Sequence, residues 1–337
     1  MMKPLGQLPK TIQAWCVVAV LLVGLVSVGP ARSQTPWLRV AHTLFPGGFG
    51  QALGSDGKDL YVLRQFATNA RVSFQRFGLD DGLVTGSFNL PPPPQALQNG
   101  TTMAFDPDGN LYALFGSEHG KRRRFFSRFT AGQWLALAPT PFDQGAGDAQ
   151  TFVSFQGERF VYTVLGARAA FARYNLGPNR WETLPAPPWA CSGNGSALAW
   201  DGGEFVYALQ GSDCDNTPSR AFARYYLSLQ LWETLPDVPE AVNYGGSLLW
   251  DGDVSLYATT GSDVPFAGRT LLRYDLEAQR WDASLPPLNC SVGEYNGNRL
   301  AAVAGRLYYW QGAPPTWNDT PLCDGKGLYL FAWKYVS

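Results

Sequence analysis

The stretch FARYNLGPNRWETLP at residues 171–185 returns 51 residues later as FARYYLSLQLWETLP at residues 222–236. Each copy holds an arginine–tyrosine pair, a short polar turn and then a tryptophan. A phrase that recurs about every 50 residues is typical of a protein built from copies of one supersecondary unit. The decisive question is how far along the chain this unit extends.

Fainter copies extend over most of the chain. Turn dipeptides such as Asp201-Gly202 separate two apolar runs in each copy, and this is a strong hairpin signal. Each unit therefore reads as four strands, and we predict an all-β, six-bladed β-propeller of four-stranded antiparallel blades. The repeated arginines, each followed by an aromatic residue, are Arg76, Arg128, Arg173, Arg224 and Arg273. The tyrosines that recur in the apolar run before the arginine position are Tyr61, Tyr112, Tyr162, Tyr207, Tyr257 and Tyr308.

The ends of the chain predict how the ring closes. The last unit has no residues left for a fourth strand, whereas PWLRV at residues 36–40 resembles one. We therefore expect the N-terminal strand to complete the C-terminal blade, which leaves no free sheet edge along the ring. Residues 34–337 form a single propeller domain in this prediction, with blades at about 47–94, 98–142, 147–188, 194–239, 245–288, and 297–337 plus 36–45.

The spacing of these residues resembles that of the kelch family, whose units carry glycine after the second strand and then tyrosine and tryptophan. Where kelch units usually have two glycines, this chain has Gly-Ser, as in Gly116-Ser117 and Gly211-Ser212. The unit FDPDGNLYALFG at residues 105–116 is more similar to an NHL-type blade. The resemblance covers residues 37–337 and implies a propeller.

The residues that recur in every copy are expected to serve the fold. Trp181 and Trp232 are predicted to fill the core between blades, and Trp200 and Trp250 are read in the same way. The repeated arginines are expected to satisfy carbonyls or carboxylates between neighbouring blades.

The N-terminal residues 1–33 are predicted to be a secretory signal peptide, because Lys3 and Lys10 precede a short apolar run that ends in small residues. The alternative is that this segment is kept as an uncleaved membrane anchor. Its removal with Arg32 takes the net charge from −1 to about −4. We expect a secreted, periplasmic or cell-surface protein, a monomer with no membrane span after signal removal. The acidic balance argues against a nucleic-acid partner.

Cysteines beyond residue 33 are even in number and fit an oxidising compartment. Cys191 and Cys214 flank the first hairpin of one predicted blade, and Cys290 and Cys323 hold the same places in another. In the pairing 191–214 with 290–323, each disulfide joins two loops that lie on the same face of a single blade. We predict these two disulfides as loop staples.

The starts of the inner strands bring polar and aromatic residues to the mouth of the channel. Amide and carboxyl side chains can hydrogen-bond a saccharide there and aromatic rings can stack on it, although the same residue types also form strand-entry turns. The predicted ligand-binding residues are Asn99, Gln150, Trp189, Asn194, Tyr244, Tyr295 and Asn296.

No cofactor is expected. Only two histidines occur, His42 and His119, which excludes a histidine-rich copper or zinc centre. Asp213 and Asp215 offer clustered oxygens to calcium, a weak candidate because such a pair also forms turns.

Three functions remain open. The first is non-catalytic binding of carbohydrate or extracellular protein through the loop face. A similarity to bacterial kelch-type sialic acid mutarotases implies a metal-independent saccharide-modifying enzyme, for which Asp148, Glu294 and Arg299 would supply the carboxylates and the basic group. The third is a structural module of an extracellular assembly.

Overall fold

The computed structural model describes residues 37–43, 50–66, 71–117, 123–262, 268–290, 300–310 and 328–334. They belong to one compact unit, Thr35–Ser337. Within the described ranges, no helix has the length and apolar character needed to cross a membrane.

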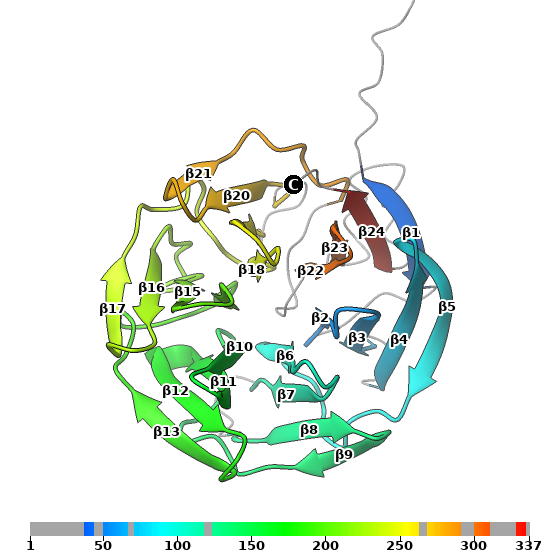
Figure 1. Cartoon of the computed structure of the whole chain (residues 1–337), viewed down its shortest axis with the longest axis horizontal. Helices are drawn as coiled ribbons and strands as arrows, with labels where there is room; N and C mark the ends of the chain where they lie inside the picture. The colour runs from blue at the N-terminus through cyan, green and yellow to red at the C-terminus, as the bar shows by residue number, and fades with distance from the viewer. Residues whose placement is uncertain are drawn as a thin grey trace, which may run out of the picture. The chain divides into compact units, whose positions relative to one another are not determined.

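The described strands form six four-stranded antiparallel sheets arranged as blades of a ring (Figure 1), which confirms the predicted propeller. We number the blades along the chain and call their strands a to d from the channel outward. Blade 1 comprises β2 (Ala52–Ser55), β3 (Leu60–Gln65), β4 (Val72–Asp80) and β5 (Leu83–Leu90). Blade 2 comprises β6 (Thr101–Phe105), β7 (Leu111–Phe115), β8 (Phe126–Thr130) and β9 (Gln133–Ala136). Blade 3 comprises β10 (Ala149–Phe155), β11 (Glu158–Leu165), β12 (Ala170–Asn175) and β13 (Arg180–Leu184), with the 3₁₀ turn η1 (Gly166–Arg168) after β11.

Blade 4 comprises β14 (Ala197–Trp200), β15 (Phe205–Leu209), β16 (Phe222–Tyr226) and β17 (Leu231–Thr234). Blade 5 comprises β18 (Ser247–Trp250), β19 (Ser255–Thr259), β20 (Leu271–Asp275) and β21 (Arg280–Asp282). Blade 6 comprises β22 (Leu300–Val303), β23 (Arg306–Trp310), β24 (Leu328–Lys334) and the N-terminal β1 (Leu38–Thr43). The a-to-b and c-to-d turns lie on one face, here called the turn face, and the b-to-c and d-to-a connections lie on the opposite loop face.

The hairpins between strands a and b are held by their own aspartates. Oδ1 of Asp201 accepts hydrogen bonds from the N–H groups of Gly203 (2.9 Å) and Phe205 (3.1 Å). Asp251 closes the same turn in blade 5 through Asp253 and Ser255. An aspartate that binds nearby backbone N–H groups favours a tight turn, which explains why Asp-Gly marks these positions.

The repeated tryptophans of strand d join neighbouring blades, as predicted. Nε1 of Trp181 donates to the carbonyl of Ala138 (2.9 Å), which follows strand d of the preceding blade, and Nε1 of Trp232 donates to Pro185 (2.9 Å). Each ring also packs on a phenylalanine of the preceding strand c, with centroids 4.9 Å apart, as for Phe171 and Trp232. Blades 2 to 5 thus reuse one contact, the strand-d tryptophan, to hold the preceding blade.

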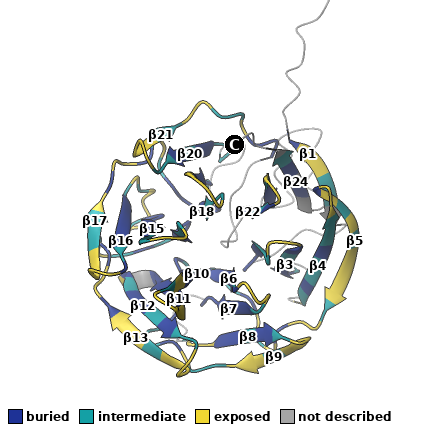
Figure 2. Cartoon of the chain, in the orientation of Figure 1, coloured by how far each residue is buried: buried dark blue, intermediate teal, exposed yellow. Residues whose placement is uncertain are grey.

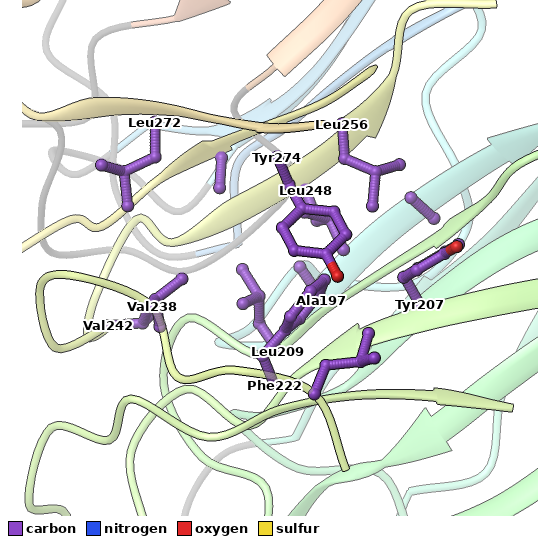
Figure 3. Close-up of a cluster of buried hydrophobic side chains, with 13 residues drawn as sticks. Ala197, Tyr207, Leu209, Phe222, Val238, Val242, Leu248, Leu256, Leu272 and Tyr274 are labelled. Carbon is purple, nitrogen blue, oxygen red and sulfur yellow. The ribbon is translucent and has the colours of Figure 1, made fainter. Parts of the chain in front are cut away.

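The core lies between blades. Figure 3 shows the boundary of blades 4 and 5, where Tyr207, Leu209 and Phe222 face Leu248 and Tyr274. The inner strands are mostly buried, whereas the outer strands alternate with exposed positions (Figure 2). Trp200 and Trp250 pack on these inter-blade clusters from the end of strand a, as expected.

The expectation that the repeated arginines act between blades is wrong for most of them. Arg173 on β12 pairs with Glu182 on β13 (2.8 Å), and Arg224 on β16 pairs with Glu233 on β17 (2.7 Å). Each pair faces directly across two strands of one blade, since the register places the two residues opposite each other. The arginines therefore tie strand d to strand c.

The N-terminal strand β1 pairs antiparallel with β24 and takes the place of strand d in blade 6. Leu38 lies opposite Ala332, so the residue before it faces Trp333. That residue is Trp37, which is 4% exposed and packs on Tyr309 and Trp333 at centroid distances of 4.8 and 5.6 Å. Trp37 supplies the strand-d tryptophan that the C-terminal segment lacks.

Candidate functional site

The inner strands of all six blades lie around the centre of the ring (Figure 1). Residues of these strands line a cavity of about 310 Å³. Its lining is largely apolar and includes Met103, Phe105, Phe152, Leu249 and Trp250. Side chains of this kind do not polarise a substrate or move a proton. The polar candidates lie instead at the loop-face end of the inner strands.

That end is bordered by tight turns, one before strand a of each of blades 2 to 5. The turns are closed by N–H···O=C bonds from Thr101 to Gln98, Asp148 to Gly145, Ser196 to Gly193 and Gly246 to Asn243, at 2.8 to 3.3 Å. They abut one another, because a Cβ on Gly100 would lie 1.9 Å from the carbonyl oxygen of Gly145 in the next blade. Gly100 has φ +86°, a conformation that favours glycine at the third position of such a turn.

Three of the predicted ligand-binding residues belong to these turns. Asn99 and Tyr244 are partly exposed, whereas Asn194 is 3% exposed. The backbone N–H of Asn194 donates to Oγ of Ser212 (3.0 Å) in its own blade. The structure thus places Asn99 and Tyr244 where a ligand could reach them and places Asn194 in the interior.

Gln150 is buried in β10 and links two blades. Its Nε2 donates to the carbonyls of Thr102 (2.8 Å) and Tyr112 (2.9 Å) in blade 2. Its side chain also lines the central cavity, and its Oε1 has no hydrogen-bond partner among the described residues. The N–H groups of this amide therefore join blade 3 to blade 2.

Asp148, the one catalytic candidate among the described residues, closes the turn that precedes β10. Its Oδ1 accepts the N–H groups of Gly145 (2.9 Å) and Gly166 (2.8 Å). In blade 2 the hydroxyl of Thr101 accepts the N–H of Gln98 in the same way (3.1 Å). Burial raises the pKa of Asp148 well above its usual range, against the opposing effect of these two backbone hydrogen bonds.

Several buried polar atoms near the turns have no hydrogen-bond partner within the described part of the chain. Such groups are rare in proteins and are normally satisfied by water or a ligand. They occur in blades 2 to 5 and comprise Oδ1 of Asn99, Oδ2 of Asp148, Oε1 of Gln150, Oγ of Ser196, and both amide atoms of Asn243.

Blade 4 carries a cross-linked set of loops on the loop face. Cys191 and Cys214 form the predicted disulfide, with their Cα atoms 5.2 Å apart. Gln210 adds a bond from Nε2 to the carbonyl of Cys191 (2.9 Å), and isolated β-bridges join Ser212 to Pro218 and Ser219 to Val242. We call residues 185–196, 210–221 and 239–246 the blade-4 loop cluster.

Trp189 is the aromatic residue of this cluster. It is partly exposed, its Nε1 donates to Oγ of Ser192 (2.8 Å), and its ring lies 6.3 Å from that of Trp232. The indole therefore packs on the core of the blade, and a hydrogen bond fixes its orientation.

The calcium candidates lie in the same cluster. Oδ1 of Asp213 accepts the N–H groups of Asp215 and Thr217, both at 2.9 Å, so this oxygen closes its own loop. Among the residues whose placement is described, no group of three or more His, Cys, Asp or Glu could hold a metal ion. Calcium binding stays a prediction.

The other predicted residues lie outside the described ranges. They are Glu294, Tyr295, Asn296, Arg299 and Cys323. Cys290 is described and is disulfide-bonded.

A second cavity, of about 630 Å³, opens on the turn face between blades 2 and 3. Its lining includes Asp106, Tyr112, Arg128, Arg159 and Arg180. The repeat alone predicts the same role for Arg128 as for the other four repeated arginines. The signal that distinguishes it is printed in the sequence, because the tryptophan of strand d is followed by Leu135 in blade 2 and by glutamate in blades 3 and 4.

Neither a scan of protein-family models nor a search of curated proteins gives a match to this chain. The six-bladed ring is compatible with a kelch-like propeller, and the similarity to that family rests on the spacing of the repeat.

Proposed function

We propose that this protein is a non-catalytic binding module that acts outside the cytoplasm and recognises carbohydrate through its loop face. The observation that carries the proposal is the blade-4 loop cluster. It presents the partly exposed ring of Trp189 from loops that are held by the Cys191–Cys214 disulfide and by two β-bridges.

A rigid aromatic surface suits saccharide recognition. An indole face packs on the apolar face of a sugar ring at little cost in conformational entropy. A loop that is already cross-linked in its binding conformation also loses little entropy when a ligand arrives. Exposed Asp215 and Asn216 in the same cluster, together with Asn99 and Tyr244 at the channel mouth, offer partners for sugar hydroxyls.

The disulfides support a location outside the cytoplasm, because reducing conditions inside most cells keep cysteines as thiols. Cys191, Cys214 and Cys290 are all oxidised in this structure. The predicted signal peptide would deliver the chain to such a compartment.

The saccharide-modifying alternative draws less support from the geometry. The carboxyl of Asp148 is held by two backbone N–H groups in a turn-closing position that threonine fills in blade 2. Asp148 therefore has a structural role, which is to close this turn, and that role involves no substrate.

A glycan array probed with the purified protein tests the proposal. We expect specific binding to one class of saccharide, and we expect the signal to fall about tenfold or more in Trp189→Ala, as is usual for an aromatic residue central to an interface. Phe88→Ala is the matched control, because Phe88 is an aromatic residue 49% exposed on the outer strand β5. No binding to any saccharide, or equal loss in both variants, would contradict the proposal and turn attention to a protein partner.

A further inference from the structure

Blade 2 breaks the repeat at the arginine of strand c. Each of the other four repeated arginines has a carboxylate oxygen within 4.0 Å of a guanidinium nitrogen. These pairs are Arg76 with Asp59, Arg173 with Glu182, Arg224 with Glu233 and Arg273 with Asp282. Arg128 has no ion-pair partner in the described part of the chain, and the residue opposite it on β9 is Leu135.

The same arginine also lacks the aromatic support found in neighbouring blades. The guanidinium of Arg173 lies 4.6 Å above the ring of Phe160, and that of Arg224 lies 4.3 Å above Phe205. Two residues before the repeated tyrosine, where blades 3 and 4 have these phenylalanines, blade 2 has Asn110. Compared with Arg173 and Arg224, Arg128 therefore lacks both the carboxylate partner and the aromatic ring.

Its remaining contact is a phenol. Arg128 interacts with Tyr112, whose hydroxyl also donates to Oδ2 of Asp106 (3.2 Å). Burial is the main cause that raises the pKa of Tyr112 to about 12, so the phenol stays neutral and does not compensate the charge of Arg128. Nε of Arg128 is buried without a hydrogen-bond partner among the described residues. Arg76 and Arg273 have the same unpaired Nε, but each has a carboxylate oxygen within 4.0 Å. Arg128 has none in the described part of the chain, so its charge favours an incoming anion.

The cavity beside Arg128 is large enough for such an anion. Its volume of about 630 Å³ falls within the range of small-molecule sites. Arg180 lines it from the start of β13 and has no ion-pair partner in the described ranges. The acidic residues of the lining are already engaged. Asp108 pairs with Arg159, Asp106 accepts four hydrogen bonds within blade 2, and Glu158 accepts one from Asn175.

We propose that the cavity between blades 2 and 3 is a binding site for a small organic acid, whose carboxylate takes the place of the acidic side chain missing opposite Arg128. Arg128 and Arg180 supply the guanidinium groups, which match the planar carboxylate in geometry and charge. Asn110 and Asn175 line the same cavity. Each amide nitrogen donates one N–H to Asp106 or Glu158 and keeps its second N–H for a ligand hydroxyl. The site lies on the turn face and is independent of the loop-face function proposed above.

Isothermal titration calorimetry with D-glucuronate, and with D-glucose as its neutral counterpart, tests this site. We expect the purified protein to bind glucuronate and to bind glucose at least tenfold more weakly. Arg128→Gln and Arg180→Ala should each weaken glucuronate binding, by about tenfold or more for Arg128, because a charge-assisted pair is lost.

The decisive variant is Leu135→Glu, which restores within the chain the acid that blades 3 and 4 carry. Leu135 is 40% exposed, so the new side chain can reach Arg128 without entering the core. We expect this variant to fold with unchanged or higher thermal stability and to lose glucuronate binding about tenfold or more. Leu231→Glu, at a residue 59% exposed on the outer strand of blade 4, is the matched control and should bind within about twofold of the unmodified protein. Undiminished binding by Leu135→Glu, or no binding of glucuronate by the unmodified protein, would overturn the proposal.

Discussion

Blade 4 and blade 2 have the same architecture and differ in how they use it. In blade 4, Arg224 stacks on Phe205 and pairs with Glu233, so the outer strand is tied to the strand inside it. In blade 2, Arg128 stands at the same position, but Leu135 replaces the acid. In blade 4 the carboxylate that pairs with the arginine comes from the blade itself. In blade 2 the guanidinium of Arg128 has no such partner among the described residues and lies beside a cavity. Residues that recur between blades hold the ring together, and both proposed ligand sites lie where a blade departs from the repeat.

Blade 6 departs in another way, because its outer strand comes from the opposite end of the chain. Replacing Trp37 by alanine should reduce the free energy of unfolding by about 3–5 kcal/mol, the usual cost of truncating a buried tryptophan. Trp37 is 4% exposed and packs on two aromatic rings at the junction of the two chain ends. Urea-induced unfolding measures the loss.

The control for this prediction is the next residue on the same strand. Leu38 is 54% exposed, so Leu38→Ala should change the free energy of unfolding by less than about 0.5 kcal/mol. Equal effects of the two substitutions would show that β1 does not close the ring through Trp37.

The disulfide distinguishes blade 4 from blade 3, whose connection between strands b and c is the short turn η1. Replacing both Cys191 and Cys214 by serine should cost about 3 kcal/mol, since the bond closes a loop with a sequence separation of 23 residues. Urea-induced unfolding of the double variant without reductant gives the value. An unchanged midpoint would mean that the β-bridges alone order these loops.

The turn before strand a distinguishes blade 3 from blade 2, because Asp148 replaces Thr101. Burial raises the pKa of Asp148 in the folded protein above that in the unfolded chain. Its contribution to stability is therefore complete below the unfolded pKa and is lost as pH rises through the folded pKa. Asp148→Asn keeps the oxygen that accepts the two N–H groups and cannot ionise. We expect it to be more stable than the unmodified protein at alkaline pH, where the buried carboxyl of Asp148 has to ionise, and to have a flatter pH profile between pH 4 and 8.

Thermal unfolding over this pH range, with each protein referenced to its own value at pH 4, measures the difference. Parallel profiles would show that burial does not raise the pKa of Asp148 in the folded protein.

The blades could be predicted from the sequence because their decisive contacts are between residues that recur. The tryptophans of strand d and the Asp-Gly turns each have one role in the blades where they recur, so their spacing located the strands. The disulfide between Cys191 and Cys214 followed for the same reason, since the topology brings both loops to one face.

The partners of the polar residues were harder to predict, because they depend on register and backbone geometry. Arg173 and Glu182 are nine residues apart and face each other only through the pairing of β12 with β13. The role of Asp148 depends on two backbone N–H groups, one of which lies 18 residues away. Gln150 was predicted as a ligand-binding residue, and its donor half is committed to the backbone of blade 2.

The contrast between repeated and unrepeated residues can be tested on two neighbouring tryptophans. Trp232 recurs in the blades and Trp189 does not, although their rings lie only 6.3 Å apart. For Trp232→Leu and Trp189→Leu we would measure the free energy of unfolding and the glycan-array signal side by side. We expect Trp232→Leu to lose about 2–3 kcal/mol of stability and to keep its binding specificity. Trp189→Leu should lose binding at a cost below about 1 kcal/mol in stability. The reverse pattern, or binding that follows stability in both variants, would contradict this prediction.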